Sequence, residues 1–438
     1  MVSLYPHQIE GLKAVEGLQN CALYWDMGLG KTFGGSEQIM QYGNYVNLVI
    51  CQKSKIDDWA EHFEKHYPKY EVYDLTQKRD FEIFTSVNSD RMIGIINYEL
   101  AFRRPALKKL HDFTLLLDES SMIQNENAKR SKFILNLNPR NVILLSGTPT
   151  AGKYENLWSQ LHLLGWNITK KRYMEHYVDT EWIEDTESGF KIPHVIGYKN
   201  VDRLKEKLAE YGANFMKSDE AFKLPEQIEI PVMVSTSKEY RTFMKKNLVA
   251  AKKLDANISG LETGVESELI GDTTLTKRLY ARQLCGQYSK EKLQAFEDLV
   301  FSTNERLIVF YNFNEELSLL QQVALKKTPN ISYVNGNRKD LQAYFLYDDS
   351  ITFVQYQAGA MGLNLQKANR IVYYTLTDKS ELFEQSKKRI HRIGQEKTCF
   401  YHYLLCKNSV EMDVLATLKL RKDYTDELFN DYSKRNGS

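Results

Sequence analysis

The chain has 438 residues and a formal net charge of +1, with 58 Lys and Arg residues against 57 Asp and Glu residues. At roughly 150 residues per domain this length predicts two or three domains, and one core stops growing at about 250–300 residues. The 42% hydrophobic and 26% charged fractions exclude a largely disordered chain. The near-zero net charge gives no overall sign of nucleic-acid binding, so any such binding must come from local patches.

The five cysteines are scattered and form no C-x-x-C pair. This excludes a disulfide framework and a cysteine zinc motif, and it indicates a reducing compartment. No signal-peptide pattern opens the sequence, and no apolar run approaches the roughly 20 residues of a membrane helix. We therefore expect a soluble, cytoplasmic protein without membrane association.

The first third of the chain alternates short apolar runs with amphipathic stretches. The predicted strands are residues 20–25, 46–51, 92–97, 113–118 and 141–145, and the predicted helices include residues 32–42, 54–66 and 128–137. Strands that are apolar on both faces and alternate with helices indicate a doubly wound parallel sheet.

A second series of the same kind begins near Arg306. Its predicted strands are residues 307–311, 331–334, 351–355 and 370–375, and its predicted helices are residues 313–325, 339–346 and 379–391. The sequence therefore predicts two α/β lobes, residues 1–228 and 229–438.

The region between the two series, residues 152–303, has a mostly helical and polar pattern. It contains a loop-like turn at 184–189, a strand-like segment at 228–234 and a basic helical stretch at 238–253. We place the hinge between the lobes near residues 225–237. The basic stretch is interpreted as a solvated helix face, with a DNA-tracking surface as the alternative.

A glycine-rich segment between the first strand and the first helix predicts a phosphate-binding loop. Glycines let the backbone N–H groups face a phosphate, and the helix N-terminus adds partial positive charge. In this pattern Lys31 reaches the β- and γ-phosphates and the Thr32 hydroxyl binds Mg²⁺. The predicted nucleotide-binding residues of this segment are Met27, Gly28, Leu29, Gly30, Lys31 and Thr32.

Two adjacent carboxylates end the strand at 113–118, at the sheet edge where ligands bind. Asp118 can hold Mg²⁺, and Glu119 can orient and deprotonate an attacking water. A solvated turn is the alternative interpretation of the pair, which the upstream phosphate loop disfavours. The next strand ends in Ser146 and Thr148, whose hydroxyls could contact the carboxylates.

Phosphoryl transfer also needs positive charge on the transition state, which an arginine finger supplies. The second series offers Arg389 and Arg392, three residues apart on the predicted helix or at its end. A solvated, dipole-favoured helix cap is the alternative interpretation of this basic cluster.

The ordered set of motifs resembles the superfamily-two helicase motors, and most closely the Swi/Snf-type DNA translocases. The resemblance is carried by residues 27–32, Asp118-Glu119, residues 146–149, residues 358–365 and residues 389–395, and it covers roughly residues 4–420. One departure is Ser121, which stands where the family has the histidine of its Asp-Glu-Ala-His box. The small size suggests a minimal motor from a bacterium or a phage-infected cell.

The resemblance implies two RecA-like lobes with helical insertions between them, which bind ATP and Mg²⁺. It assigns Gln8 to reading the adenine base, places Gly362 and Gln395 at the nucleotide, and gives Thr32 and Asp118 to the metal. It implies that DNA crosses both lobes. The candidate nucleic-acid contacts are Lys53, Ser54, Asn97, Tyr98, Asn312, Phe313, Gln357, Ala358 and Gly359.

The expected function is a DNA-dependent ATPase that translocates on double-stranded DNA as a monomer. Lys31, Asp118, Glu119, Arg389 and Arg392 are its predicted catalytic residues. Two alternatives stay open at the sequence level. One is a helicase that separates or anneals strands on branched DNA, single strands or RNA, and the other is a nucleotide-controlled DNA clamp with little turnover.

Overall fold

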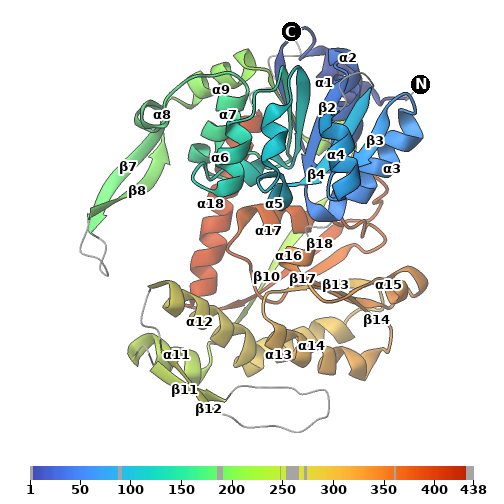
Figure 1. Ribbon diagram of the computed structural model, residues 1–438. Coiled ribbons are helices and arrows are strands. Elements are labelled where there is room, and N and C mark those ends of the chain that lie inside the picture. Colours follow the sequence, from blue (N-terminus) through green and yellow to red (C-terminus); the bar gives the residue numbers. More distant parts are fainter. Residues whose placement is uncertain are drawn as a thin grey trace. The chain divides into compact units, whose positions relative to one another are not determined.

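The computed structural model describes residues 3–86, 91–184, 191–246, 248–252, 266–270, 274–359 and 362–430. The chain divides into two compact units, of which the first comprises residues 1–223 and 421–438 and the second residues 224–420. Each unit contains one seven-stranded sheet with helices on both faces (Figure 1). The predicted class, two α/β units built on parallel-dominated sheets, is thus confirmed.

The sheet of the first unit has the order β3-β4-β2-β5-β6-β1-β9, and all of its neighbouring strands are parallel. The strands are β1 (Asn20–Trp25), β2 (Val46–Cys51), β3 (Glu71–Asp74), β4 (Met92–Asn97), β5 (Phe113–Asp118), β6 (Asn141–Leu145) and β9 (Ala213–Met216). The helices are α1 (Pro6–Lys13), α2 (Lys31–Tyr42), α3 (Ile56–His66), α4 (Lys78–Ser86), α5 (Tyr98–Ala101), α6 (Lys129–Leu135), α7 (Trp158–Leu163), α8 (Lys170–Tyr177), α9 (Val201–Glu210) and α10 (Ser218–Ala221).

Alternation along β1 shows why this sheet needs helices on both sides. Leu23 and Trp25 belong to the core that includes Ile39 of α2, whereas Ala22 and Tyr24 belong to the core on the opposite face. Because successive side chains of a strand point to opposite faces, a strand that is apolar throughout requires two covering layers.

The sheet of the second unit has the order β10-β18-β17-β13-β16-β14-β15, and only the β14–β15 pair is antiparallel among its described strands. The strands are β10 (Gln227–Val234), β13 (Leu307–Tyr311), β14 (Ile331–Val334), β15 (Lys339–Asp340), β16 (Ile351–Gln355), β17 (Arg370–Tyr373) and β18 (Cys399–Cys406). The helices are α11 (Lys238–Lys246), α12 (Thr274–Gln287), α13 (Lys290–Phe301), α14 (Asn314–Lys327), α15 (Gln342–Leu346), α16 (Tyr356–Gly359), α17 (Ser380–Lys387) and α18 (Val410–Asn430), which belongs to this unit as far as residue 420.

The division of the chain differs from the predicted one at both ends of the second lobe. Residues 224–228 belong to the second unit, because β10 pairs along its whole length with β18. The predicted hinge at 225–237 is therefore largely occupied by an edge strand. The chain after residue 420 belongs to the first unit, where Asp426 forms an ion pair with Lys217 and the Tyr424 carbonyl accepts a hydrogen bond from Tyr154.

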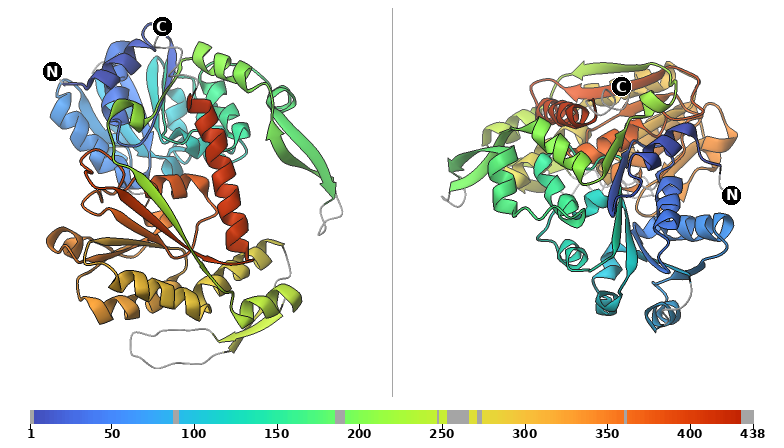
Figure 2. Two further views of the ribbon diagram at one scale, coloured as in Figure 1. Left: turned by 180° about the vertical axis from the view of Figure 1, so that it is seen from behind. Right: turned by 90° about the horizontal axis from the view of Figure 1, so that it is seen from above.

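The middle region is less helical than predicted. It forms an antiparallel hairpin of β7 (Val178–Glu184) and β8 (Lys191–Tyr198), which projects from the first unit (Figure 2). The basic stretch 238–253 is helical only to Lys246, after which β11 (Leu248–Lys252) pairs with β12 (Glu266–Ile270). Lys253 and most of the predicted turn at 184–189 lie outside the described residues. Hairpin pairing is a non-local contact that overrides local helix preference.

One glycine illustrates the close packing of the first sheet. Gly212 precedes β9 with a φ of 83°, and a Cβ atom added there would overlap the carbonyl oxygen of Asn20. We expect Gly212→Ala to lower the free energy of unfolding by about 3 kcal/mol, through left-handed strain and the backbone clash. Gly17, with a φ of 77° and open space around its added Cβ, is the matched control, since Gly17→Ala carries only the strain of about 1 kcal/mol. Equal losses in chemical denaturation would contradict the steric argument.

Candidate functional site

The glycine-rich segment forms a loop between β1 and α2 in the first unit. Gly28 and Gly30 have φ angles of 89° and 72°, a region that favours glycine. The loop therefore brings the chain from the carboxyl end of β1, an interior strand of the sheet, directly to the N-terminus of α2 at Lys31. Backbone N–H groups at such a helix start attract anions, and this is the geometry of a phosphate site.

The Lys31 side chain points back toward the first residues of this loop. Its Nζ donates hydrogen bonds to the Trp25 carbonyl at 2.8 Å and to the Asp26 carbonyl at 3.3 Å. A Cβ atom at Gly147, just beyond β6, would lie only 3.4 Å from the same Nζ. The ammonium group thus sits where the loop after β1 meets the loop after β6.

The two carboxylates lie at the same edge of the sheet. β6 is hydrogen-bonded to both β1 and β5, so the carboxyl ends of all three strands meet there. The Glu119 Oε1 atom accepts hydrogen bonds from Ser146 Oγ at 2.6 Å and from Ser121 Oγ at 3.1 Å. The predicted carboxylate contact is therefore present for Ser146, whereas the Thr148 hydroxyl is buried without a hydrogen-bond partner among the described residues. Ser121 thus helps to orient the same carboxylate as Ser146.

Burial and the nearby Lys31 charge have opposite effects on the pKa values of Asp118 and Glu119. Burial raises the pKa of Asp118 and of Glu119 above their ordinary values. The Lys31 ammonium opposes this for both groups, as does a hydrogen bond to each carboxylate. Glu119 also has a φ of 62°, a left-handed conformation that is costly for glutamate and concentrates at functional sites.

Trp59 contacts the candidate site and was not among the predicted site residues. Its indole Nε1 on α3 donates a 2.8 Å hydrogen bond to Asp118 Oδ2, while its ring stacks on Phe63 at a centroid distance of 5.5 Å. A tryptophan that is buried by packing still needs a partner for its N–H group. The sequence therefore indicates that the Trp59 N–H group has a hydrogen-bond acceptor, but it does not indicate that this acceptor is Asp118.

Loss of this hydrogen bond is expected to weaken the predicted metal site at Asp118. Trp59→Phe keeps an aromatic ring at this position but removes the N–H donor, which leaves Asp118 less stabilised as a carboxylate. We therefore expect the Mg²⁺ concentration for half-maximal ATP turnover to rise by about threefold to tenfold. Trp158→Phe is the matched control, because Trp158 Nε1 donates instead to the carbonyl of Ile168. An unchanged Mg²⁺ dependence in Trp59→Phe would show that the indole does not support the metal site.

Gln8 contacts the phosphate loop directly. Its Nε2 atom donates to the carbonyls of Leu29 and Gly30 at 3.1 and 3.3 Å, and its Oε1 accepts from the Tyr5 N–H group at 2.9 Å. His7 Nε2 contacts the same Leu29 carbonyl at 3.1 Å. Gln8 was predicted to read the adenine base. In the structure its side chain instead supports the phosphate loop through these hydrogen bonds.

In the second unit, the predicted finger residues lie beyond a helix rather than on it. α17 ends at Lys387, so the helix predicted to reach residue 391 is shorter, and Arg389 and Arg392 lie in the turns that follow. Arg392 is half-buried and donates to Asn364 Oδ1, whereas Arg389 is buried and its carbonyl accepts from the Leu365 N–H group.

The same turns are joined to the segment that follows α16. Gln395 Nε2 donates to the carbonyls of Gln366 and Ala368 at 3.1 and 2.8 Å. Gly362 has a φ of 67°. The structure therefore brings residues 362–366 and 389–395 together, with the Gln395 side chain occupied by its own chain. Ala360 and Met361 of the predicted motif lie outside the described residues.

The nucleic-acid candidates of the first unit divide into accessible and inaccessible residues. Lys53 and Ser54 are exposed in the short helix Lys53–Lys55. Asn97 is buried and donates to Glu99 at 3.1 Å. Tyr98 is fully buried, and its hydroxyl donates to the Asp118 carbonyl at 3.0 Å. This geometry excludes the Tyr98 side chain as a phosphate contact and gives it a role in holding the carboxylate turn.

The candidates of the second unit lie at the carboxyl edge of its sheet. Asn312 Nδ2 donates to the Thr375 carbonyl and hydroxyl at 3.2 and 3.0 Å, and Phe313 is the N-cap of α14. Gln357 is exposed, whereas Ala358 and Gly359 are buried. Gln357 is therefore the accessible member of its segment.

A buried glutamate holds the Asn312 turn. Glu316 Oε2 accepts hydrogen bonds from the backbone N–H groups of Asn312 and Phe313 and from the Thr375 hydroxyl, whereas its Oε1 has no hydrogen-bond partner within the described ranges. This is the N3 glutamate of a capping box. Burial raises the pKa of Glu316 to about 7.

This shift predicts a pH-dependent stability. Because the folded-state pKa exceeds the unfolded value, the stabilisation is complete below about pH 4.5 and is lost as the pH rises through about 7, by up to about 3 kcal/mol. Glu316→Gln keeps an acceptor oxygen and cannot ionise, so its loss of unfolding free energy between pH 5 and pH 8 should be smaller than that of the parent. Glu315→Gln is the control. Parallel pH profiles for the parent and Glu316→Gln would refute this assignment.

None of the helices in the described part of the chain is long and apolar enough to cross a membrane. A family model described as SNF2-related domain matches residues 7–290, and one described as helicase conserved C-terminal domain matches residues 291–394.

Two relatives and one solved structure show where the similarity lies. An ISWI chromatin-remodeling complex ATPase of Saccharomyces cerevisiae is 26% identical over 470 residues, which cover 97% of this chain and 39% of the relative. A DNA annealing helicase and endonuclease of Homo sapiens is 23% identical over 459 residues, which cover 98% of this chain and 40% of the relative. The chain thus spans about 40% of the length of these relatives. The Sulfolobus solfataricus SWI2/SNF2 ATPase core in complex with dsDNA is 19% identical with a TM-score of 0.44, covering 100% of this chain and 95% of that one.

Proposed function

The chain belongs to the SNF2-related family, and from this premise we propose that it is a DNA-dependent ATPase that couples Mg-ATP hydrolysis to translocation along double-stranded DNA. The observation that carries the proposal is the edge of the first sheet. There, a glycine loop, a lysine and a serine-bound glutamate come from the ends of three neighbouring strands.

The residues of the first unit have separate roles in this proposal. The N–H groups of the loop and the Lys31 ammonium bind the phosphates, which requires Lys31 to turn from the Trp25 carbonyl toward the ligand. The Thr32 hydroxyl and the Asp118 carboxylate are oxygen donors of the kind that Mg²⁺ prefers. When bound, Mg²⁺ neutralises phosphate charge.

Glu119 is the proposed general base. The hydroxyls of Ser146 and Ser121 both donate to its Oε1, so its other carboxylate oxygen is the one to accept a proton from water. The two hydrogen bonds hold the carboxylate in one orientation, as a base requires when geometry limits the rate. Lys31 favours the ionised form that accepts the proton.

Arg392 is the proposed arginine finger. It is the more accessible of the two predicted arginines, and Asn364 orients its guanidinium. Arg389 is buried beside the chain segment that contains Leu365, which fits a supporting role. In this proposal the second unit must approach the nucleotide bound to the first unit during each cycle, as in enzymes whose sites are completed by closure.

The proposed partner is double-stranded DNA, contacted through its backbone. The two relatives named above are described as a chromatin-remodelling ATPase and a DNA annealing helicase, which supports DNA as the polymer. Lys53, Ser54 and Gln357 are the accessible candidates for phosphate contact. Such side chains position a protein on DNA without reading its sequence.

The test is ATP hydrolysis measured at one stated salt concentration without nucleic acid and with single-stranded DNA, duplex DNA or RNA. We expect duplex DNA to stimulate turnover most, with displacement of a triplex-forming strand from the duplex reporting translocation. Turnover within about tenfold of background with every polymer would instead indicate a clamp. Stimulation by RNA or single strands alone would overturn the duplex assignment, whereas separation of the strands of blunt duplexes would indicate a helicase instead of a translocase.

A further inference from the structure

A cavity of about 770 Å³ opens in the second unit, at the carboxyl ends of β10 and β18. Its lining combines apolar and cationic side chains with neutral polar ones and a single carboxylate, that of Asp413, so cations outnumber anions three to one. Three methionines, Met233, Met244 and Met412, supply apolar surface, and three cations, Lys277, Arg278 and Lys407, supply charge. Apart from Met244, which lies in the basic stretch 238–253, none of these residues belongs to the nucleotide or nucleic-acid candidates discussed above.

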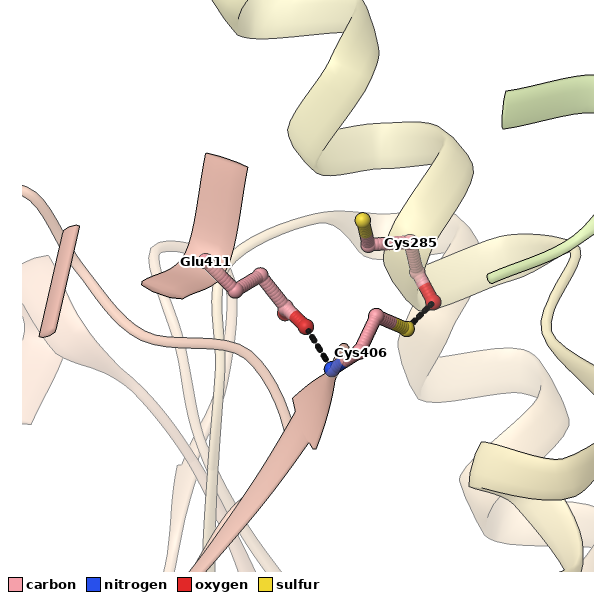
Figure 3. A group of neighbouring side chains, drawn as sticks. All are labelled: Cys285, Cys406 and Glu411. Atoms are coloured by element: carbon pink, nitrogen blue, oxygen red, sulfur yellow. Dashed lines mark hydrogen bonds between the residues drawn. The ribbon is translucent and has the colours of Figure 1, made fainter. Parts of the chain in front are cut away.

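The walls of the cavity are held by hydrogen bonds between elements distant in sequence. The Val410 N–H group of the β18–α18 turn donates to the Tyr240 hydroxyl of α11 at 2.9 Å. Cys406 at the end of β18 donates through its N–H group to Glu411 at 2.9 Å, and its Sγ contacts the Cys285 carbonyl of α12 at 3.8 Å (Figure 3). The cavity is therefore pre-formed, as binding sites usually are.

Cys285 and Cys406 belong to a buried cluster that links the elements around the cavity. The ligand atoms of Cys285, Cys406 and Glu411 lie within 4.8 Å of one another and all three residues are buried. Both carboxylate oxygens of Glu411 already accept hydrogen bonds, one of them from the buried ammonium of Lys292. A cation in that position disfavours a divalent metal, so this cluster serves to join α12, α13, β18 and α18.

The side chains that line the cavity indicate which class of ligand fits it. Met233 and Met244 are 37% and 41% exposed, and flexible thioethers at a surface suit the side chains of a partner. Lys277, Arg278 and Lys407 form no ion pair with any residue that the structure describes. A nucleic-acid backbone would use the cations and leave the methionines without a partner, whereas an acidic peptide with apolar side chains uses both.

We propose that this cavity is a docking site for an acidic amphipathic peptide segment of a protein partner. Its apolar side chains pack on Met233, Met244 and Met412, and its flanking carboxylates pair with Lys277, Arg278 and Lys407. Helix-in-groove binding uses this combination of apolar anchors and complementary charge. The site does not depend on the ATPase assignment.

The test is fluorescence anisotropy of the full chain with a short fluorescein-labelled peptide in which leucine and phenylalanine recur at helical spacing between glutamates. We expect saturable binding with a Kd between about 1 and 100 µM, weakening as salt is added. The double variant Lys277→Glu/Lys407→Glu should bind at least about tenfold more weakly. Met244→Ser should also weaken binding by about threefold or more without changing the salt dependence.

The double variant Lys78→Glu/Lys171→Glu is the charge-matched control, because both lysines are highly exposed on the first unit. It should bind the peptide as the parent does, with circular dichroism confirming that every variant is folded. Absence of saturable peptide binding to the folded parent would overturn the proposal. So would a Lys277→Glu/Lys407→Glu variant that loses affinity for labelled duplex DNA and keeps its affinity for the peptide.

Discussion

Glu119→Gln is expected to lower ATP turnover by about a thousandfold or more while ATP still binds. Glutamine keeps an oxygen that can accept the hydrogen bonds from Ser146 and Ser121, so the loop and the strand ends should stay in place. It cannot accept a proton, so water activation is lost. The measurements are steady-state hydrolysis with duplex DNA and equilibrium binding of a fluorescent ATP analogue.

Glu82→Gln serves as the control for this prediction, since Glu82 is an exposed partner of Lys78 on α4. Its turnover should match that of the parent. If Glu119→Gln retained full duplex-stimulated turnover, Glu119 would not be the base. If it lost nucleotide binding as well, its role would lie in building the site.

The second large effect is expected from Arg392→Ala, which should reduce turnover by about a thousandfold. The physical reason is that a guanidinium stabilises charge that develops only in the transition state, so its removal should lower kcat far more than it weakens ATP binding. Arg392→Lys should recover little, because the flexible ammonium lacks the planar fork that donates to Asn364. Single-turnover hydrolysis separates this effect from product release.

Two further arginine variants sharpen this test. Arg338→Ala removes an exposed arginine of the same unit that pairs with Asp340, and it should leave turnover unchanged. Arg389→Ala should lower the free energy of unfolding, because Arg389 is buried. If Arg389→Ala lost turnover at unchanged stability while Arg392→Ala stayed active, Arg389 would be the finger and Arg392 the supporting residue.

Much of the fold was predictable because the central strands are continuous apolar runs. The predicted strands at 20–25, 46–51, 92–97, 113–118 and 141–145 coincide with observed strands of the first sheet. A strand that is covered on both faces is recognised from its own residues, whatever its neighbours are. Short or edge strands carry less local signal, and both β3 and β9 were missed.

A long strand that was missed, β18, shows the limit of local patterns. β18 has eight residues, rich in aromatic and apolar side chains, and pairs with β10 and β17. Its pairing with β10 joins residues 227–234 to residues 399–406. That register placed residues 224–228 in the second unit. The strand-like segment predicted at 228–234 is confirmed as part of β10, which occupies most of the region where the hinge was predicted.

The sequence by itself determined the chemical groups of the site and their order along the chain. The loop at 25–32, the Asp118-Glu119 pair and the hydroxyls after β6 follow buried strands, and parallel strands bring their carboxyl ends to one edge. Only the tertiary structure decided which side chains surround them. Trp59 contacts Asp118, Gln8 braces the Leu29 carbonyl, and Tyr98 is buried against the carboxylate turn. These contacts join residues far apart in the chain, so they depend on how the helices pack over the sheet rather than on any local pattern.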